Sequence, residues 1–115
     1  MAKHFSTSLI ASGKTWDEIE EDMRDTGYTG TTWMVYSDQF GVSPDFIARL
    51  FTDLEEAKRF ATSFTEEQVI KIFGSPYEAQ MRVEEDRWED GEYLEIGFCT
   101  WYGFDWTDDG WVPAV

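Results

Sequence analysis

The stretch from Ser43 to Gly74 carries the most regular pattern of apolar and polar positions in the chain. Two interpretations of residues 46–64 compete. Apolar residues at three- and four-residue steps predict one continuous helix capped at Ser43. Alternatively, the aromatic and branched run Phe46–Phe51 is a strand, and a helix follows it. We favour the strand, because Thr52-Asp53-Leu54-Glu55 fits a capping box that would begin a new helix.

The residues after this helix predict another strand. Gln68–Phe73 alternates Val69, Lys71 and Phe73 against the residues between them, which is the period of a strand. Gly74-Ser75-Pro76 then ends the segment. The central stretch is therefore expected to run strand, helix, strand.

The first third of the chain predicts a strand, a helix and a second strand. Phe5–Ala11 is predicted to be a strand, followed by a turn at Ser12-Gly13-Lys14. Thr15-Trp16-Asp17-Glu18 fits a capping box, so we expect a helix over the sequence TWDEIEEDMRD that buries Trp16, Ile19 and Met23. Thr31–Ser37, rich in threonine and apolar residues, predicts the next strand.

The last third predicts antiparallel strands joined by tight turns. Tyr77–Glu85 alternates apolar and polar residues, as a half-exposed strand does. Asp86–Glu92 contains an Asp-Gly step and is expected to be a hairpin turn, with Tyr93–Tyr102 as the returning strand. A second Asp-Gly step in the tail after Tyr102 predicts a further small hairpin.

The order of these elements predicts an α+β fold. The first six elements run strand, helix, strand, strand, helix, strand, which is typical of the split βαβ, or ferredoxin-like (βαββαβ), arrangement. C-terminal β-hairpins would extend it. The more general prediction is a mainly antiparallel sheet with two helices on one face. The length of 115 residues is that of one domain, so we expect a single domain over residues 1–115.

The net charge of −15 is the strongest clue to function. It arises from 24 acids against 9 bases and exceeds what solubility requires. Self-repulsion makes such an imbalance costly, so it needs an explanation. Three explanations of this charge are open: a basic partner, bound cations or an acidic proteome. Direct binding to nucleic acid is disfavoured, because the phosphates would be repelled.

Several features predict a cytoplasmic chain. Cys99 is the only cysteine, so an internal disulfide cannot form, which suits a reducing compartment. No stretch has the length and purity of a transmembrane helix, and the apolar core near the N-terminus is too short for a secretory signal.

The sequence predicts no catalytic, cofactor-binding or metal-binding residues, and therefore no enzyme. Gly13-Lys14-Thr15 resembles the end of a phosphate-binding loop, but Ser8 stands where the first glycine should be. The two Asp-Gly turns begin like calcium loops and lack the glutamate at the twelfth position. His4 and Cys99 are too few to form a zinc site.

Acidic residues and aromatic rings are concentrated together towards the C-terminus. Residues 75–115 hold eleven acids and two bases, with several tryptophans and tyrosines among them. Aromatic rings set among charges are the residue types that anchor protein interfaces. The leading hypothesis is an inhibitor that presents carboxylates where nucleic acid would present phosphates, in the basic groove of a nucleic-acid-binding enzyme or complex.

This composition resembles that of many small bacteriophage proteins that disarm host nucleases or CRISPR complexes. That resemblance implies a phage-encoded, anti-defence protein acting in the host cytoplasm. The predicted partner-binding residues are Asp17, Glu20, Glu21, Glu84, Glu85, Asp86, Trp88, Glu89, Asp90 and Trp106.

Two other function classes stay open. A small adaptor or accessory subunit would bind its partner through the C-terminal aromatics, and salt would weaken that contact little. A cation-binding protein or an enzyme would use clustered carboxylates, and cations would then raise its thermal stability.

Overall fold

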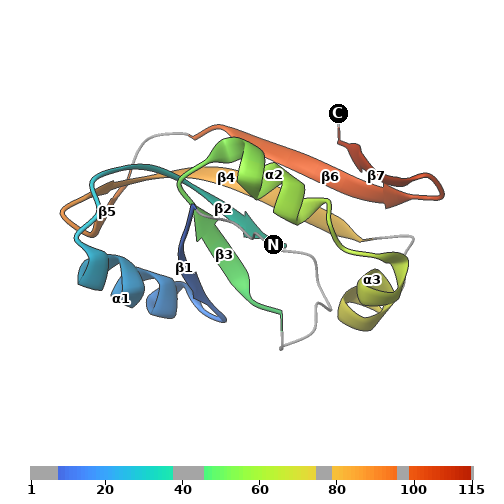
Figure 1. Ribbon diagram of the computed structural model, residues 1–115, viewed down its shortest axis with the longest axis horizontal. Helices are drawn as coiled ribbons and strands as arrows, with labels where there is room; N and C mark the ends of the chain where they lie inside the picture. The colour runs from blue at the N-terminus through green and yellow to red at the C-terminus, as the bar shows by residue number, and fades with distance from the viewer. Residues whose placement is uncertain (1–7, 38–45, 75–78, 96–98, 115) are drawn as a thin grey trace, which may run out of the picture.

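The computed structural model describes residues 8–37, 46–74, 79–95 and 99–114. Seven strands form one antiparallel sheet in the order β1-β3-β2-β4-β6-β7, and β5 pairs with β4 (Figure 1). The predicted α+β class is confirmed. The strands are β1 (Leu9–Gly13), β2 (Gly30–Tyr36), β3 (Ala48–Phe51), β4 (Gln80–Glu89), β5 (Glu92–Leu94), β6 (Trp101–Thr107) and β7 (Gly110–Pro113). The helices are α1 (Trp16–Thr26), α2 (Leu54–Ala61) and α3 (Glu66–Phe73).

The ferredoxin-like strand order is not confirmed. Strands β1 and β2 lie on either side of β3, as in a split βαβ unit. However, β4 pairs with β2 instead of lying beside β1. Strand β1 is thus at the edge among the described strands, and the β6–β7 hairpin extends the opposite edge.

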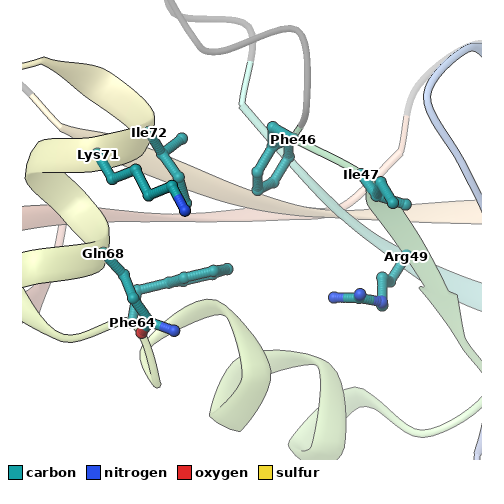
Figure 2. A pocket seen from close by; sticks show the side chains of 7 residues that line it. All are labelled: Phe46, Ile47, Arg49, Phe64, Gln68, Lys71 and Ile72. Atoms are coloured by element: carbon teal, nitrogen blue, oxygen red, sulfur yellow. The ribbon is translucent and has the colours of Figure 1, made fainter.

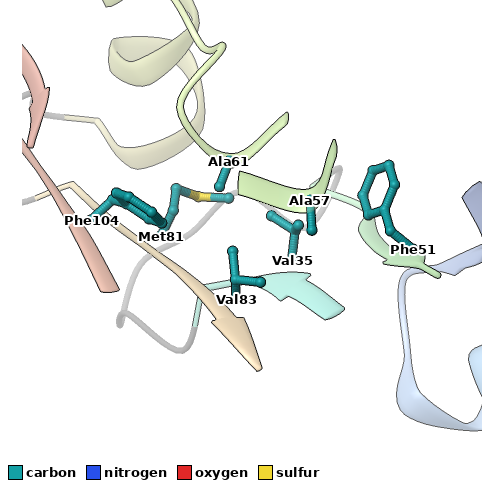
Figure 3. Packing of buried hydrophobic residues seen from close by; sticks show 7 residues of the cluster. All are labelled: Val35, Phe51, Ala57, Ala61, Met81, Val83 and Phe104. Atoms are coloured by element: carbon teal, nitrogen blue, oxygen red, sulfur yellow. The ribbon is translucent and has the colours of Figure 1, made fainter. Parts of the chain in front are cut away.

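The helices α1 and α2 cover opposite faces of the sheet. Neighbouring residues of a strand point to opposite faces. Val35 and Phe51 pack with α2 in one core cluster (Figure 3), whereas the adjacent Met34 and Leu50 pack with α1 in a second cluster. The expectation that both helices share one face is therefore wrong. A central strand that is covered on both faces carries apolar residues at successive positions. Such a run does not show which helix covers which face of the sheet.

Helix α1 has the predicted capping at its N-terminus. The Thr15 hydroxyl accepts the Glu18 amide, and the Glu18 carboxylate accepts the Thr15 amide at 3.0 Å. Gly27 ends the helix in the left-handed conformation, with φ 66°. The first strand is confirmed from Leu9 onward and continues through the expected turn to Gly13, while residues 5–7 lie outside the described residues.

The strand interpretation of the central stretch is confirmed, because β3 pairs with both β1 and β2. The helix that follows is capped one residue later than predicted. The Asp53 carboxylate, not the Thr52 hydroxyl, accepts the Glu56 amide at 2.9 Å. Ser43, the cap of the one-helix interpretation, lies outside the described residues.

The predicted strand Gln68–Phe73 is wrong, because this segment forms most of α3. Thr65 and Gln68 form a capping box that begins a helix. Val69 is buried and Phe73, four residues later, packs against the core, so both lie on one helical face. A run of six residues is too short to distinguish the period of a strand from that of a helix. The capping box at Thr65 and Gln68 favours the helix.

Strand β4 is longer than predicted, because it runs through Asp86 to Glu89. Only Asp90-Gly91 forms the turn, with φ 51° and 82° at the two residues, as a two-residue hairpin prefers. The returning chain is divided between β5 and β6, which pair with different parts of β4. Residues 77–78, in the predicted strand, lie outside the described residues.

Candidate functional site

Two acidic elements, α1 and the β4–β5 hairpin, contact each other at one end of the molecule (Figure 1). The link between them is an ion pair in which Arg24 Nε lies 3.6 Å from Glu92 Oε2. Arg24 is the only base in α1. We call this surface the acidic end and define it by Asp17, Glu20, Glu21, Glu89, Asp90 and Glu92, which are all exposed or half-exposed.

The side of α1 that faces the hairpin is acidic. Residues three, four and seven positions apart lie on the same side of a helix. Asp17, Glu20 and Glu21 precede Arg24 by these intervals, and Arg24 contacts the hairpin. Three of the predicted residues thus share the side of α1 that carries Arg24, which reaches the hairpin at the C-terminal end of the helix.

The hairpin turn is hydrogen-bonded to the loop that follows α1 and packs against the end of the helix. The Gly91 amide donates to the Tyr28 carbonyl at 2.9 Å, and the Asp90 amide donates to Thr29 Oγ1 at 2.9 Å. A Cβ atom on Gly91 would lie 2.6 Å from the Met23 carbonyl oxygen, so only glycine fits this approach. The carboxylates of the acidic end are therefore held on a rigid support.

Aromatic rings fill the space beneath the acidic end. Trp16 of α1 lies 5.7 Å from Trp88 and 5.1 Å from Tyr93, centroid to centroid, and Trp88 lies 5.5 Å from Tyr93. Trp88 is only 2% exposed, and its indole donates to Thr32 Oγ1 at 2.8 Å. Its burial contradicts the prediction that Trp88 anchors a partner, because β4 continues past the expected turn and directs this ring into the core.

Asp86 is also buried, at 2% exposure, so it does not contribute charge to the surface as predicted. Burial, with a smaller effect from the neighbouring Glu84 and Glu85 charges, raises its pKa to about 7. Within the described part of the chain, its Oδ2 atom has no hydrogen-bond partner. Asp86 is thus an interior carboxyl whose ionisation is disfavoured by its burial.

Glu84 and Glu85 lie on β4 before the acidic end and point to opposite faces of the sheet. Glu84 accepts a 2.8 Å hydrogen bond from the Tyr36 hydroxyl. Glu85 forms a 2.9 Å ion pair with Arg87, which lowers the Glu85 pKa, and it also accepts the Thr100 amide. Both carboxylates already have local partners, so they contribute less to the acidic surface than was predicted.

Trp106 is not part of the acidic end. It lies in the β6–β7 hairpin, whose turn is at the opposite end of the molecule from α1 (Figure 1). Its half-buried ring packs edge-on against Trp111 at 5.4 Å, and the Trp111 indole donates to the Phe64 carbonyl at 3.1 Å. This pair fixes the hairpin to the segment between α2 and α3.

Sequence reasoning did not select Glu92, which forms the ion pair with Arg24. The available signal was its position after the Asp-Gly step. Glu92 pairs directly with Glu89 in the β4–β5 ladder, and like charges at such positions destabilise a hairpin. The ion pair of Glu92 with Arg24 offsets part of this repulsion.

The described residues include neither a metal-binding cluster nor a helix that could span a membrane. They contain no group of three or more histidine, cysteine, aspartate or glutamate side chains placed to hold a metal ion. None of their helices combines the length and apolar character needed to cross a membrane. Comparisons with protein-family models, curated proteins and solved structures find no match.

Proposed function

We propose that the protein is an inhibitor that binds a basic protein surface through its acidic end. The observation that carries the proposal is the rigid docking of two acidic elements, α1 and the β4–β5 hairpin. Arg24 is the only base of α1, and it is paired with Glu92 within the same surface. The acidic end therefore offers a basic partner carboxylates in a fixed arrangement, and preorganisation of this kind lowers the cost of binding.

The partner class follows from the charge. Grooves that hold nucleic acid are lined with basic side chains, and phosphate charge supplies much of their affinity. A rigid acidic surface on a protein of net charge −15 is steered to such grooves over long range. The proposed partner is a nuclease or a CRISPR-type complex, and binding would exclude its DNA or RNA. In a phage-encoded protein this would be an anti-defence activity in the host cytoplasm.

The test is capture of partners from a lysate of the native host by the tagged protein, after nuclease treatment to remove bridging nucleic acid. The expected partner is a nucleic-acid-binding protein that is released at high salt and displaced by its own DNA or RNA. A partner that is retained in high salt and ignores nucleic acid would contradict the proposal.

One observation favours the adaptor alternative. Trp101 is 53% exposed, more than any other large apolar side chain among the described residues. The Arg82 guanidinium lies 4.5 Å from its ring centroid, a cation–π arrangement that leaves part of the ring at the surface. An apolar partner would use Trp101 instead of the acidic end, and the two surfaces can be altered separately.

A further inference from the structure

A pocket of about 310 Å³ lies between the beginning of β3 and helix α3 (Figure 2). Its volume is at the lower end of the range for small-molecule sites. Helix α3 and the acidic end lie at opposite ends of the molecule, so the pocket is separate from the surface described above (Figure 1). The residues that line it are Phe46, Ile47, Arg49, Phe64, Gln68, Lys71 and Ile72.

The floor and one wall of the pocket are apolar. Phe46 and Phe64 lie 6.2 Å apart, centroid to centroid, with their rings tilted by 48°. Phe64 also packs edge-on against Phe60 at 5.3 Å, which fixes its orientation. Ile72 extends the apolar surface from α3 (Figure 2). These side chains offer an apolar surface of two tilted rings against which a ring or a short aliphatic chain can pack.

Two cations reach the pocket from opposite walls. Arg49 projects from β3 and Lys71 from α3, and both side chains extend towards the space between them (Figure 2). The Arg49 guanidinium is held 4.8 Å from the Phe60 centroid. Among the described residues, no carboxylate forms an ion pair with either cation. In a chain with 24 acids and 9 bases, two cations that no described carboxylate pairs with make a local site for an anion at this hollow.

The polar side of α3 is not needed for packing. Val69 and Phe73 attach α3 to the rest of the protein, while Gln68 and Lys71 are exposed. The Gln68 Oε1 atom accepts the Thr65 amide at 2.8 Å in the capping box. This bond fixes the side chain and leaves its amide NH₂ group as a further donor at the pocket.

We propose that this pocket binds a small organic anion with an apolar body and one carboxylate. The carboxylate would lie between Arg49 and Lys71, and the ring or chain would lie against Phe46 and Phe64. Guanidinium and ammonium groups recognise a carboxylate by charge-assisted hydrogen bonds. The proposal is independent of the inhibitor function, because none of these residues belongs to the acidic end.

The test is a titration followed by amide chemical shifts in nuclear magnetic resonance, with naphthylacetate and its uncharged methyl ester as probes. We expect naphthylacetate to shift the amides of residues 46–49 and 64–72, and the ester to bind at least tenfold more weakly. Lys71→Glu should weaken naphthylacetate binding at least tenfold, because attraction becomes repulsion at close range. Arg59→Glu reverses a charge at an exposed position of α2 and serves as the control. It should change the affinity for naphthylacetate less than threefold.

Three results would overturn the proposal. Equal binding of the ester would show that the pocket selects only apolar bodies. Unchanged affinity in Lys71→Glu would remove the cationic site, and shifts confined to other residues would place the ligand elsewhere. Lys71 is exposed and its reversal leaves the core intact, so the spectrum of the unbound variant should keep the dispersion of the folded protein.

Discussion

Trp88 and Thr32 are joined by a buried hydrogen bond of 2.8 Å, from the indole Nε1 to the threonine Oγ1. The Thr32 hydroxyl in turn lies 3.5 Å from the main-chain carbonyl oxygen of Asp86, the residue opposite it in the β2–β4 ladder. The hydroxyl is thus directed to the main chain and not to the Asp86 carboxylate. This arrangement places Trp88 in the core and leaves Asp86 Oδ2 without a donor among the described residues.

Replacing Thr32 by valine should destabilise the fold. Valine keeps the shape and suits a strand, but it leaves the buried Trp88 N–H group without an acceptor. An unsatisfied buried donor costs about 1–3 kcal/mol. Urea unfolding should show this loss in Thr32→Val, whereas the control Thr31→Val, on the half-exposed neighbour, should stay within about 0.5 kcal/mol of the parent. Equal stability of the two variants would contradict the role of this hydrogen bond.

Asp86 should make stability fall as the pH rises. Its pKa is about 7 in the folded protein and near the ordinary 3.8 when unfolded, so the folded state binds the proton more tightly. The stability that protonated Asp86 contributes to the free energy of unfolding is therefore fully present below pH 4. It is lost as the pH rises through 7.

Asp86→Asn removes this titration. At pH 8 the variant should be more stable than the parent by about 2–4 kcal/mol, from about three pKa units at 1.36 kcal/mol each with allowance for relaxation. Below pH 4 the two should be equally stable. Urea unfolding across this range measures the difference, with the exposed Glu89→Gln as a control. A difference that does not vary with pH would show that folding does not change the pKa of Asp86.

Gly91→Ala should loosen the acidic end. Gly91 and Gly110 both have positive φ, 82° and 98°, so alanine costs about 1 kcal/mol in backbone strain at either position. At Gly91 the new Cβ would also lie 2.6 Å from the Met23 carbonyl oxygen, whereas at Gly110 nothing lies within 4 Å. Thermal unfolding should therefore show a distinctly larger loss for Gly91→Ala than for Gly110→Ala. Equal losses would show that the hairpin moves away from α1 without cost.

Trp101→Ser distinguishes the two proposed modes of partner binding. An anchoring tryptophan loses at least about 2 kcal/mol of binding energy when it is truncated. If the acidic end carries the contact, affinity for the captured partner should change less than threefold. A loss of thirtyfold or more would favour the adaptor alternative, and the serine variant should fold normally because Trp101 is 53% exposed.

Local signals in the sequence predicted α1, β2 and the Asp-Gly turn of the β4–β5 hairpin. The Thr15 capping box and the turn at Asp90-Gly91 fix their own geometry and depend little on the rest of the chain. The same reasoning failed at residues 68–73, where alternation predicts a strand but the capping box at Thr65 begins a helix. In a segment this short, a capping box is stronger evidence for secondary structure than the alternation of apolar and polar residues.

The candidate site depended on contacts between distant segments. The sequence selected Asp17, Glu20 and Glu21, but only the close approach of Gly91 to Met23 shows that their helix packs against the hairpin. It could not show that Asp86 is buried, because carboxylates are rarely interior and the strand was expected to end before this residue. Burial of an unpaired carboxyl is set by tertiary packing, for which composition gives no signal.

The most direct test compares two charge-reversal variants against the captured partner. One replaces Asp17, Glu20, Glu21 and Glu89 of the acidic end by lysine. The other replaces the exposed acids Glu66, Glu67, Asp108 and Asp109 by lysine, which changes the net charge equally. Affinity is measured by titration calorimetry at several salt concentrations. The account predicts a loss of at least a hundredfold and a shallower salt dependence for the first variant, and a loss below tenfold for the second. Equal losses in the two variants would show that net charge alone, and not the acidic end, determines binding.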